Sequence, residues 1–182
     1  MYMNKKHYIK ILKIFPFSYY QLFYNEKVIV ISLKFFDLSM YILKNNIFFN
    51  YKILSCISGI DYYSKKYRFC VSYDLLSLVY NNRIRVKVFL SETSSILSIT
   101  NYYSSANWWE REVWDMFGIF FKNHPDLRRI LTDYGFEGYP LRKDFPISGY
   151  IEVKYDLKSK RIIIEPLELK QEFRHFIIDS QW

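Results

Sequence analysis

The stretch Ser77–Leu90 reads SLVYNNRIRVKVFL and holds the most regular pattern in the chain. In its second half apolar and basic residues alternate, with Ile84, Val86 and Val88 set against Arg83, Arg85 and Lys87. This period of two predicts a strand with one buried and one solvated face. Asn81-Asn82 separates two apolar runs, and asparagine tolerates positive φ, so we expect a two-residue hairpin turn there. We interpret the basic side chains as the solvated face, with a binding patch as the alternative.

Upstream of this stretch the sequence predicts two helices and four more strands. Residues 17–24 and 27–33 are expected to be strands joined by a tight turn at Asn25-Glu26, and residues 52–60 and 67–74 to be two further strands. Helical spacing of apolar residues is found at 8–15, which ends at Pro16, and at 35–43.

Downstream, residues 107–117 have the spacing of an amphipathic helix that ends at Gly118. We expect Asn107 and Glu110 to form a capping box at its start, and Arg111 and Asp115 to pair one turn apart. Trp108 and Trp114 lie off the main apolar face, so this helix is expected to be covered on more than one side. A second helix is expected over 127–134, opened near Pro125 and closed by Gly135.

From Gly138 onward the periodic pattern ends. Three of the five prolines fall here, and only 153–155 and 161–164 suggest short strands. We therefore predict an α+β fold, a two-layer domain with a mixed, largely antiparallel sheet and two or three helices. The α/β globular domain is assigned to residues 1–121. An extended C-terminal arm that packs on a partner subunit is assigned to residues 122–182.

The composition narrows the possible functions. The first sixty residues carry eight lysines against two acidic residues, whereas residues 106–182 carry twelve basic and thirteen acidic ones, so the chain is not a uniformly basic nucleic-acid binder. The longest uncharged run, Thr93–Trp109, is rich in Ser, Thr and Asn, so no transmembrane segment is expected.

Cys56 and Cys70 are too few for a four-cysteine metal centre and are predicted to be reduced core thiols. The abundance of Phe, Tyr, Ile, Lys and Asn, with a single Ala, is typical of an A/T-rich genome such as that of an organelle.

The charged residues near 107–144 suggest cohesion more than catalysis. Glu110 and Glu112 would project roughly 200° apart on a helix, so they cannot share one small substrate. His124 has no further ligands at metal-binding spacing. We therefore predict structural ion pairs for Glu110, Arg111, Glu112 and Asp115, and no catalytic residue. Two classes stay open, a subunit of a protein assembly and an organelle-encoded RNA-binding or ribosomal protein.

Three runs also carry a family resemblance. EREVWDMFG at Glu110–Gly118, HPDLRRILTDYGF at His124–Phe136 and PLRKDFP at Pro140–Pro146 closely resemble the signature of the 30-kDa subunit family of respiratory complex I, the NADH:ubiquinone oxidoreductase. Weaker likeness extends the match over about residues 60–175. Tyr139 stands where the family pattern usually has histidine, so a role that depends on that imidazole is not carried over.

The resemblance implies a core, non-redox structural subunit of the peripheral arm of a proton-translocating enzyme. Such a subunit supports electron transfer from NADH to ubiquinone on the matrix side of the mitochondrial inner membrane. It also implies a chain encoded in the mitochondrial genome, without a cofactor, while FMN and iron–sulfur clusters are held elsewhere in the complex. The implied partners are the 49-kDa-type quinone-site subunit, the cluster-bearing small subunit and other peripheral-arm subunits, not nucleic acid.

We expect the partner interface to include Trp108, Trp114, His124, Asp126, Arg128, Arg129, Asp133, Arg142, Lys143 and Asp144. Ion pairs within the chain are the alternative role for each charged member of this set.

Overall fold

The computed structural model describes residues 19–23, 26–168, 174 and 176. Contacts between residues divide the chain into two compact units, Met1–Asp144 and Phe145–Trp182. Residues 122–144, which the sequence analysis assigned to the arm, are therefore grouped by their contacts with the first unit. The helix expected at 8–15 lies outside the described residues.

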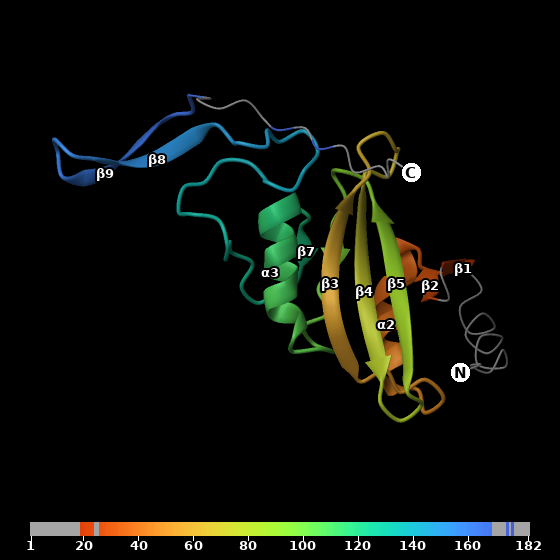
Figure 1. Cartoon of the computed structure of the whole chain (residues 1–182). Helices are drawn as coiled ribbons and strands as arrows, with labels where there is room; N and C mark the ends of the chain where they lie inside the picture. The colour runs from red at the N-terminus through yellow and green to blue at the C-terminus, as the bar shows by residue number, and fades with distance from the viewer. Residues whose placement is uncertain (1–18, 24–25, 169–173, 175, 177–182) are drawn as a thin grey trace. The chain divides into compact units, whose positions relative to one another are not determined.

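The first unit is built on a mixed five-stranded sheet in the order β1-β2-β5-β4-β3 (Figure 1). Its strands are β1 Tyr19–Phe23, β2 Glu26–Val30, β3 Ile53–Asp61, β4 Phe69–Ser77 and β5 Asn82–Leu90. Every neighbouring pair is antiparallel except β2 and β5, which are parallel. The predicted mixed, largely antiparallel sheet is confirmed.

The remaining elements of this unit are the short 3-10 helix η1 Leu33–Phe35, helices α2 Phe36–Asn45 and α3 Ala106–Phe117, and strands β6 Ile96–Leu97 and β7 Phe121–Lys122. Strands β6 and β7 form a separate parallel pair. In β5 the side chains of Ile84, Val86 and Val88 are buried, as the alternation predicts.

Helices α2 and α3 cover the same face of the sheet. On that face the Phe36 ring of α2 lies 5.0 Å from the Tyr73 ring of β4. Gly59 of β3 is opposite Val71, two residues from Tyr73, and a Cβ added to Gly59 would lie 2.5 Å from the Phe117 ring of α3. Side chains two apart on a strand share a face, so both helices pack on one side and the predicted two-layer architecture holds.

Two of the predicted turns are displaced. Ser77 pairs with Asn82, so the β4–β5 connection is residues 78–81 and not Asn81-Asn82. Asn81 takes the positive φ of 44°, while Asn82 is buried in β5 and donates its amide N–H to the Tyr51 hydroxyl at 2.8 Å. Similarly, Glu26 pairs with Phe23 and belongs to β2, not to the turn.

The two cysteines are both free thiols. Cys70 is buried, but Cys56 is half-buried on the sheet face opposite the helices, where its thiol contacts the Asp74 carboxylate at 3.3 Å. The prediction of two core cysteines is therefore wrong for Cys56. Within the described part of the chain, no helix is long and apolar enough to span a membrane.

The second unit contains one antiparallel hairpin, β8 Ile151–Asp156 with β9 Arg161–Pro166, which confirms the two short strands expected there. Its register separates two kinds of side chain. Five apolar residues share one face and are each at least 50% exposed: Ile151, Val153, Tyr155, Ile162 and Ile164. The other face holds charged residues, including the ion pair between Lys154 and Glu165.

Candidate functional site

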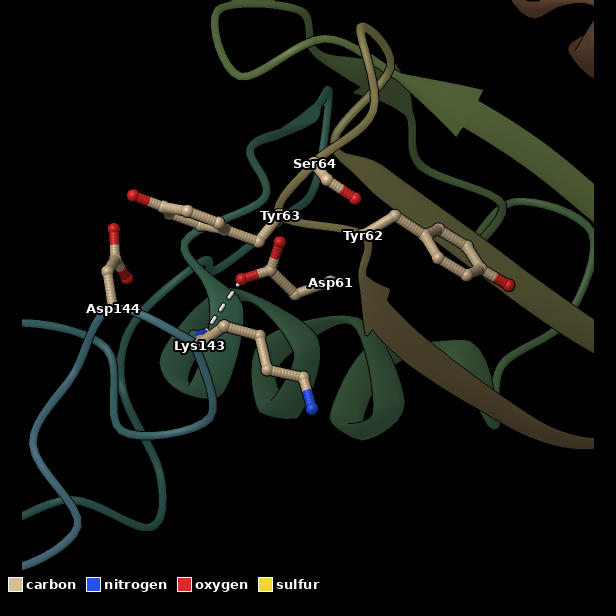
Figure 2. Close-up of a pocket in the computed structure, with 6 residues that line it drawn as sticks. All are labelled: Asp61, Tyr62, Tyr63, Ser64, Lys143 and Asp144. Carbon is tan, nitrogen blue, oxygen red and sulfur yellow. Dashed lines mark hydrogen bonds between the residues drawn. The ribbon is translucent and has the colours of Figure 1, made fainter.

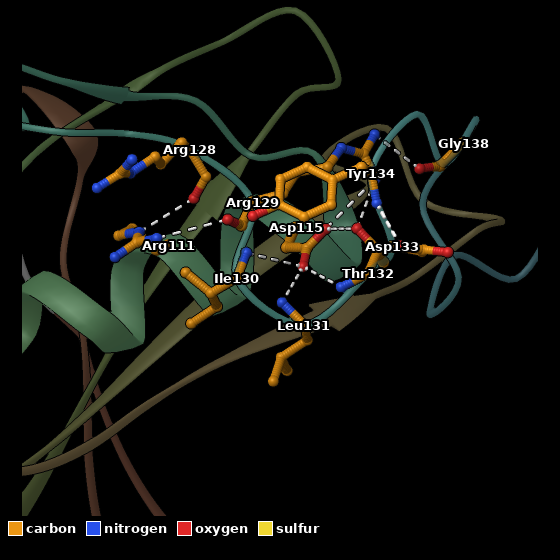
Figure 3. A network of polar contacts seen from close by, with 10 residues as sticks. All are labelled: Arg111, Asp115, Arg128, Arg129, Ile130, Leu131, Thr132, Asp133, Tyr134 and Gly138. Atoms are coloured by element: carbon orange, nitrogen blue, oxygen red, sulfur yellow. Dashed lines mark hydrogen bonds and ion pairs between the residues drawn. The ribbon is translucent and has the colours of Figure 1, made fainter.

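The charged segment, residues 124–134, is organised by one buried carboxylate (Figure 3). Asp115 of α3 is fully buried and accepts the backbone N–H groups of Ile130, Leu131 and Thr132 at 3.3, 2.8 and 2.9 Å. It also accepts the Thr132 hydroxyl at 2.6 Å and pairs with Arg129 at 3.3 Å. Burial acts to raise the pKa of Asp115, but these hydrogen bonds outweigh it and hold the pKa below its usual range.

This arrangement replaces the second helix that the spacing predicted. The charged segment has no helical hydrogen-bond ladder, and its three consecutive N–H groups at 130–132 point at Asp115 instead. A buried carboxylate that accepts several N–H groups is strongly stabilised, so the tertiary contact outweighs the local helical preference. The predicted helix over 127–134 is wrong.

The predicted pair between Arg111 and Asp115 is also wrong. Arg111 donates to the carbonyl oxygens of Arg128 and Arg129 at 3.0 and 3.4 Å, which ties α3 to the charged segment by its backbone. Asp115 pairs with Arg129 instead. Glu112 makes no hydrogen bond or ion pair with any residue that the structure describes, so its predicted ion pair is not observed.

Glu110 does not cap α3. The helix starts after Ser105 without a side-chain cap, and Asn107 lies inside it. Glu110 is fully buried and accepts the Ser98 hydroxyl at 2.6 Å and the Ile99 N–H at 2.8 Å. Burial raises the pKa of Glu110 to about 7.

A second carboxylate, Asp61 at the end of β3, holds the last residues of the first unit (Figure 2). Arg68 donates both Nε and Nη2 to Asp61, at 2.9 and 3.0 Å, and the backbone N–H of Lys143 donates to Asp61 at 2.9 Å. Arg68 also pairs with Asp144 at 3.0 Å. Burial acts to raise the pKa of Asp61, but the contacts with Arg68 and Lys143 lower it overall. Around these residues, Tyr62, Tyr63 and Ser64 complete the lining of a surface pocket.

Tyr139 lies among two arginines and a tryptophan. The guanidinium groups of Arg129 and Arg142 lie 5.1 and 4.5 Å from the centre of its ring, and the Trp114 ring lies edge-on at 5.8 Å. Arg142 Nε donates to the carbonyl oxygen of Phe117 at 2.7 Å. These are cation–π and edge-to-face contacts of the kind that stabilise a packed aromatic ring.

The comparison with known protein families now decides the assignment. The family described as "Respiratory-chain NADH dehydrogenase, 30 Kd subunit" matches residues 30–151 of this chain. The chain belongs to the 30-kDa subunit family of respiratory-chain NADH dehydrogenase. The matched range contains the whole charged segment and both carboxylate networks.

Individual relatives agree with this assignment. The chain is 52% identical over 158 residues to NADH-ubiquinone oxidoreductase subunit 9 of Prototheca wickerhamii. The aligned region covers 87% of this chain and 82% of that protein. It is 60% identical over 131 residues to NADH dehydrogenase (ubiquinone) iron-sulfur protein 3 of Solanum tuberosum. This aligned region covers 72% of this chain and 69% of that protein.

One solved structure shows the same fold at low sequence identity. A chain of the membrane-bound sulfane sulfur reductase, an archaeal respiratory membrane complex, superposes with a TM-score of 0.68 over 79% of this chain and 85% of its own length. The two chains are 21% identical, so the likeness concerns the fold alone.

In this member of the 30-kDa family, most residues predicted for an interface are engaged within the chain. Arg129, Arg142 and Asp144 form the internal contacts described above, and the exposed Arg128 pairs with the exposed Asp126 at 2.9 Å. Asp133 accepts the N–H of Tyr134 at 2.8 Å, and the side chain of His124 is buried. Their participation in an interface remains a prediction, and the internal pairs are what the structure describes.

The surface around α3 nevertheless exposes large apolar groups. Trp108 of α3 is 70% exposed, with the guanidinium group of Arg111 5.8 Å from the centre of its ring. Leu131 and Tyr134 of the charged segment are 62% and 104% exposed.

Sequence reasoning named Trp108 but missed Asp61, Arg68 and Ser98, which are far from the family motifs. The signal for Asp61 and Arg68 was their position on either side of the connection between the strands predicted at 52–60 and 67–74, where opposite charges can meet.

Proposed function

We propose that this chain is a non-redox structural core subunit of the peripheral arm of respiratory complex I. It supports electron transfer from NADH to ubiquinone in a proton-translocating enzyme by docking the 49-kDa-type quinone-site subunit, next to the cluster-bearing small subunit. Its place is the matrix side of the mitochondrial inner membrane, and we infer that it is encoded in the mitochondrial genome.

The β8–β9 hairpin is the observation that carries the docking role. A two-stranded sheet is marginally stable alone in water, and this one leaves a whole apolar face exposed. Contiguous apolar surface of this kind is typical of protein interfaces. The charged opposite face would remain in solvent, so the hairpin has the two sides that a docked surface element needs.

The cysteine content supports a non-redox role. An iron–sulfur cluster is ordinarily held by four cysteine thiolates, and this chain has two cysteines. Burial raises the pKa of Cys70 to about 11, and burial together with the nearby Asp74 raises the pKa of Cys56, so neither favours the thiolate form. We therefore propose that FMN and the clusters belong to other subunits, although some relatives carry "iron-sulfur protein" in their names.

An RNA-binding role is less well supported. Arg85 of β5 donates to Asp74 at 2.6 Å and to Glu26 at 2.6 Å, and Arg68 pairs with three carboxylates. Arginines already paired with carboxylates are poor ligands for phosphates. The family match, in addition, is to a respiratory subunit.

Val153→Lys tests the hairpin directly. The substitution places a charge in the apolar face, so we expect assembled complex I to fall at least tenfold in a native gel of detergent-solubilised mitochondria, read by NADH-oxidising activity. Glu152→Lys is the matched control, because it changes charge at the neighbouring residue on the opposite face, and it should leave assembly within about twofold.

Two outcomes would contradict the proposal. Normal assembly of the Val153→Lys complex would remove the hairpin from the interface. Comigration of the wild-type chain with ribosomal RNA, and not with NADH-oxidising activity, would favour the RNA-binding alternative.

A further inference from the structure

The buried side chains of a glutamic acid and a histidine lie side by side at the start of the charged segment. The side chains of Glu110 in α3 and His124 are both 0% exposed, and Glu110 Oε2 lies 3.8 Å from His124 Nε2. The docking role proposed above uses neither group directly. Burying two titratable side chains together is costly unless their protonation is controlled, so the pair requires an explanation.

The hydrogen bonds of His124 define its protonation state. Its Nδ1 accepts the backbone N–H of Asp126 at 3.0 Å, so Nδ1 carries no proton. The proton must then lie on Nε2, which is 3.1 Å from the carbonyl oxygen of Asn107 and donates to it. His124 is therefore a neutral imidazole that joins α3 to the first turn of the charged segment, and it offers Glu110 no positive charge.

The other groups that face Glu110 are also uncharged. Ser98 and Ile99 donate to its two oxygens, and the Thr100 hydroxyl contacts Ser98 at 2.9 Å. From β4, Tyr73 faces Glu110, and its buried hydroxyl has no hydrogen-bond partner among the described residues. No arginine or lysine in the described part of the chain pairs with Glu110. The two donors favour the carboxylate, but burial without a neighbouring positive charge outweighs them and raises the pKa of Glu110 to about 7.

We propose that Glu110 and His124 form a proton-sensitive latch that holds residues 124–126 on α3. With Glu110 protonated, both groups are neutral and the two hydrogen bonds of His124 are kept. When Glu110 releases its proton to solvent, the buried carboxylate needs a further donor. The Nε2–H of His124 then turns from the Asn107 carbonyl oxygen to Glu110.

This response breaks the hydrogen bond from His124 to the Asn107 carbonyl oxygen, which joins the charged segment to α3. A rise in pH through neutrality therefore loosens the start of the charged segment. The functional consequence rests on the proposed function and on the predicted place of this segment in the partner interface: protonation would favour the docking-competent conformation.

The sign of the pH dependence follows from the raised pKa. Glu110 binds a proton more tightly in the folded chain than in the unfolded chain, so its stabilising contribution is present at low pH and is lost as the pH rises through about 7. In the purified full-length chain, we expect the unfolding equilibrium constant to rise about tenfold between about pH 6 and about pH 8.

Two variants isolate the group responsible. Glu110→Gln mimics the protonated side chain and should remove this tenfold rise. Glu112→Gln, two residues away on the same helix and without a partner among the described residues, should keep it. An unchanged pH dependence in Glu110→Gln would overturn the proposal, and so would its loss in Glu112→Gln.

Trypsin reports on the latch itself. Cleavage after Arg128 or Arg129 requires local opening of the charged segment. At each pH the rate for the wild-type chain is divided by the rate for Glu110→Gln, which cancels the pH dependence of the protease. We expect this ratio to increase several-fold from about pH 6 to about pH 8, while the same ratio for cleavage after Lys158 in the β8–β9 turn stays constant. A constant ratio at Arg128 and Arg129 would exclude the latch.

Infrared spectroscopy of the unmodified chain covers the case in which Glu110→Gln fails to fold. A buried protonated carboxyl group gives a C=O stretching band that disappears on ionisation, and we expect it to disappear with a midpoint near the pKa of about 7. Absence of this band at about pH 6 would overturn the proposal. All three measurements use the isolated chain, so they can fail while the assembly test of Val153→Lys succeeds, and the reverse.

Discussion

Asp115 is the residue on which the conformation of the charged segment depends most. Its carboxylate is fully buried and accepts hydrogen bonds from three consecutive backbone N–H groups and the Thr132 hydroxyl. Asp115→Asn replaces one acceptor oxygen by a donor that faces those N–H groups or Arg129. We expect it to lower the free energy of unfolding by about 2–4 kcal/mol, measured by urea denaturation of the full-length chain.

Asp126→Asn is the control for this prediction. Asp126 pairs with Arg128 at 2.9 Å, but both side chains are more than half exposed, so the pair is screened by solvent. We expect a change below about 0.5 kcal/mol. Equal effects of the two substitutions would show that the buried network does not stabilise the fold.

The free energy of unfolding at acidic pH also depends on single residues. The pKa values of Asp115 and Asp61 are held below their usual range in the folded chain. Their contribution is therefore present above the unfolded pKa of 3.8 and is lost as the pH falls through the folded values. We expect Asp115→Asn to flatten the loss of stability on acidification below about pH 4, measured by urea denaturation. A profile parallel to that of the wild type would contradict this assignment.

At the scale of elements, Gly59 determines how closely α3 approaches the sheet. A Cβ at this position would lie 2.5 Å from the Phe117 ring, closer than real Cβ contacts allow. We expect Gly59→Ala to destabilise the full-length chain by about 1–3 kcal/mol, because Phe117 must leave its packed position. Thermal unfolding monitored by circular dichroism measures this effect.

Ser58→Ala, at the neighbouring exposed position of β3, provides the comparison. Its side chain points to the face away from α3, so the change should stay within about 0.5 kcal/mol. If both substitutions cost the same, the loss reflects the strand and not the contact with Phe117.

The elements also show where sequence reasoning succeeds. Alternation in β5 and apolar spacing in α3 were sufficient because these elements bury a continuous face, and burial sets their period. The helix predicted over 127–134 had the same spacing, but Leu131 and Tyr134 are exposed and the backbone there binds Asp115. A tertiary acceptor fifteen or more residues away leaves no local pattern, so this contact could not be predicted. The same reason explains the wrong pairing of Arg111 and the wrong cap for α3.

For the whole molecule, the fold and the family could be predicted from the sequence, but the internal role of the charges could not. The motif residues were expected to meet a partner, whereas Arg129, Arg142 and Asp144 are paired within the chain. A sequence shows which side chains are charged, but not which residue each of them pairs with. Pairing within the chain and contact with a partner are compatible. A segment held rigid by internal pairs can present Leu131, Tyr134 and Trp108 to a neighbour in one fixed arrangement.

The division into two units leads to a prediction about truncation. The buried hydrophobic cluster runs from Ile29 to Phe121 and lies entirely in the first unit. The hairpin of the second unit has an exposed apolar face and no buried core of its own among the described residues. A chain of residues 1–144 should therefore unfold cooperatively, with a free energy of unfolding within about 1 kcal/mol of the full-length chain, measured in urea.

The separate peptide of residues 145–182 should show no cooperative transition, because a two-stranded hairpin is marginal without a surface to cover it. A loss of more than about 3 kcal/mol in the 1–144 chain would contradict this division, since the second unit would then stabilise the first. Cooperative unfolding of the isolated peptide would be more serious for the docking role. It would mean that the exposed face of Val153 and Ile164 is stable in water, and the physical reason for the hairpin to bind a partner subunit would be gone.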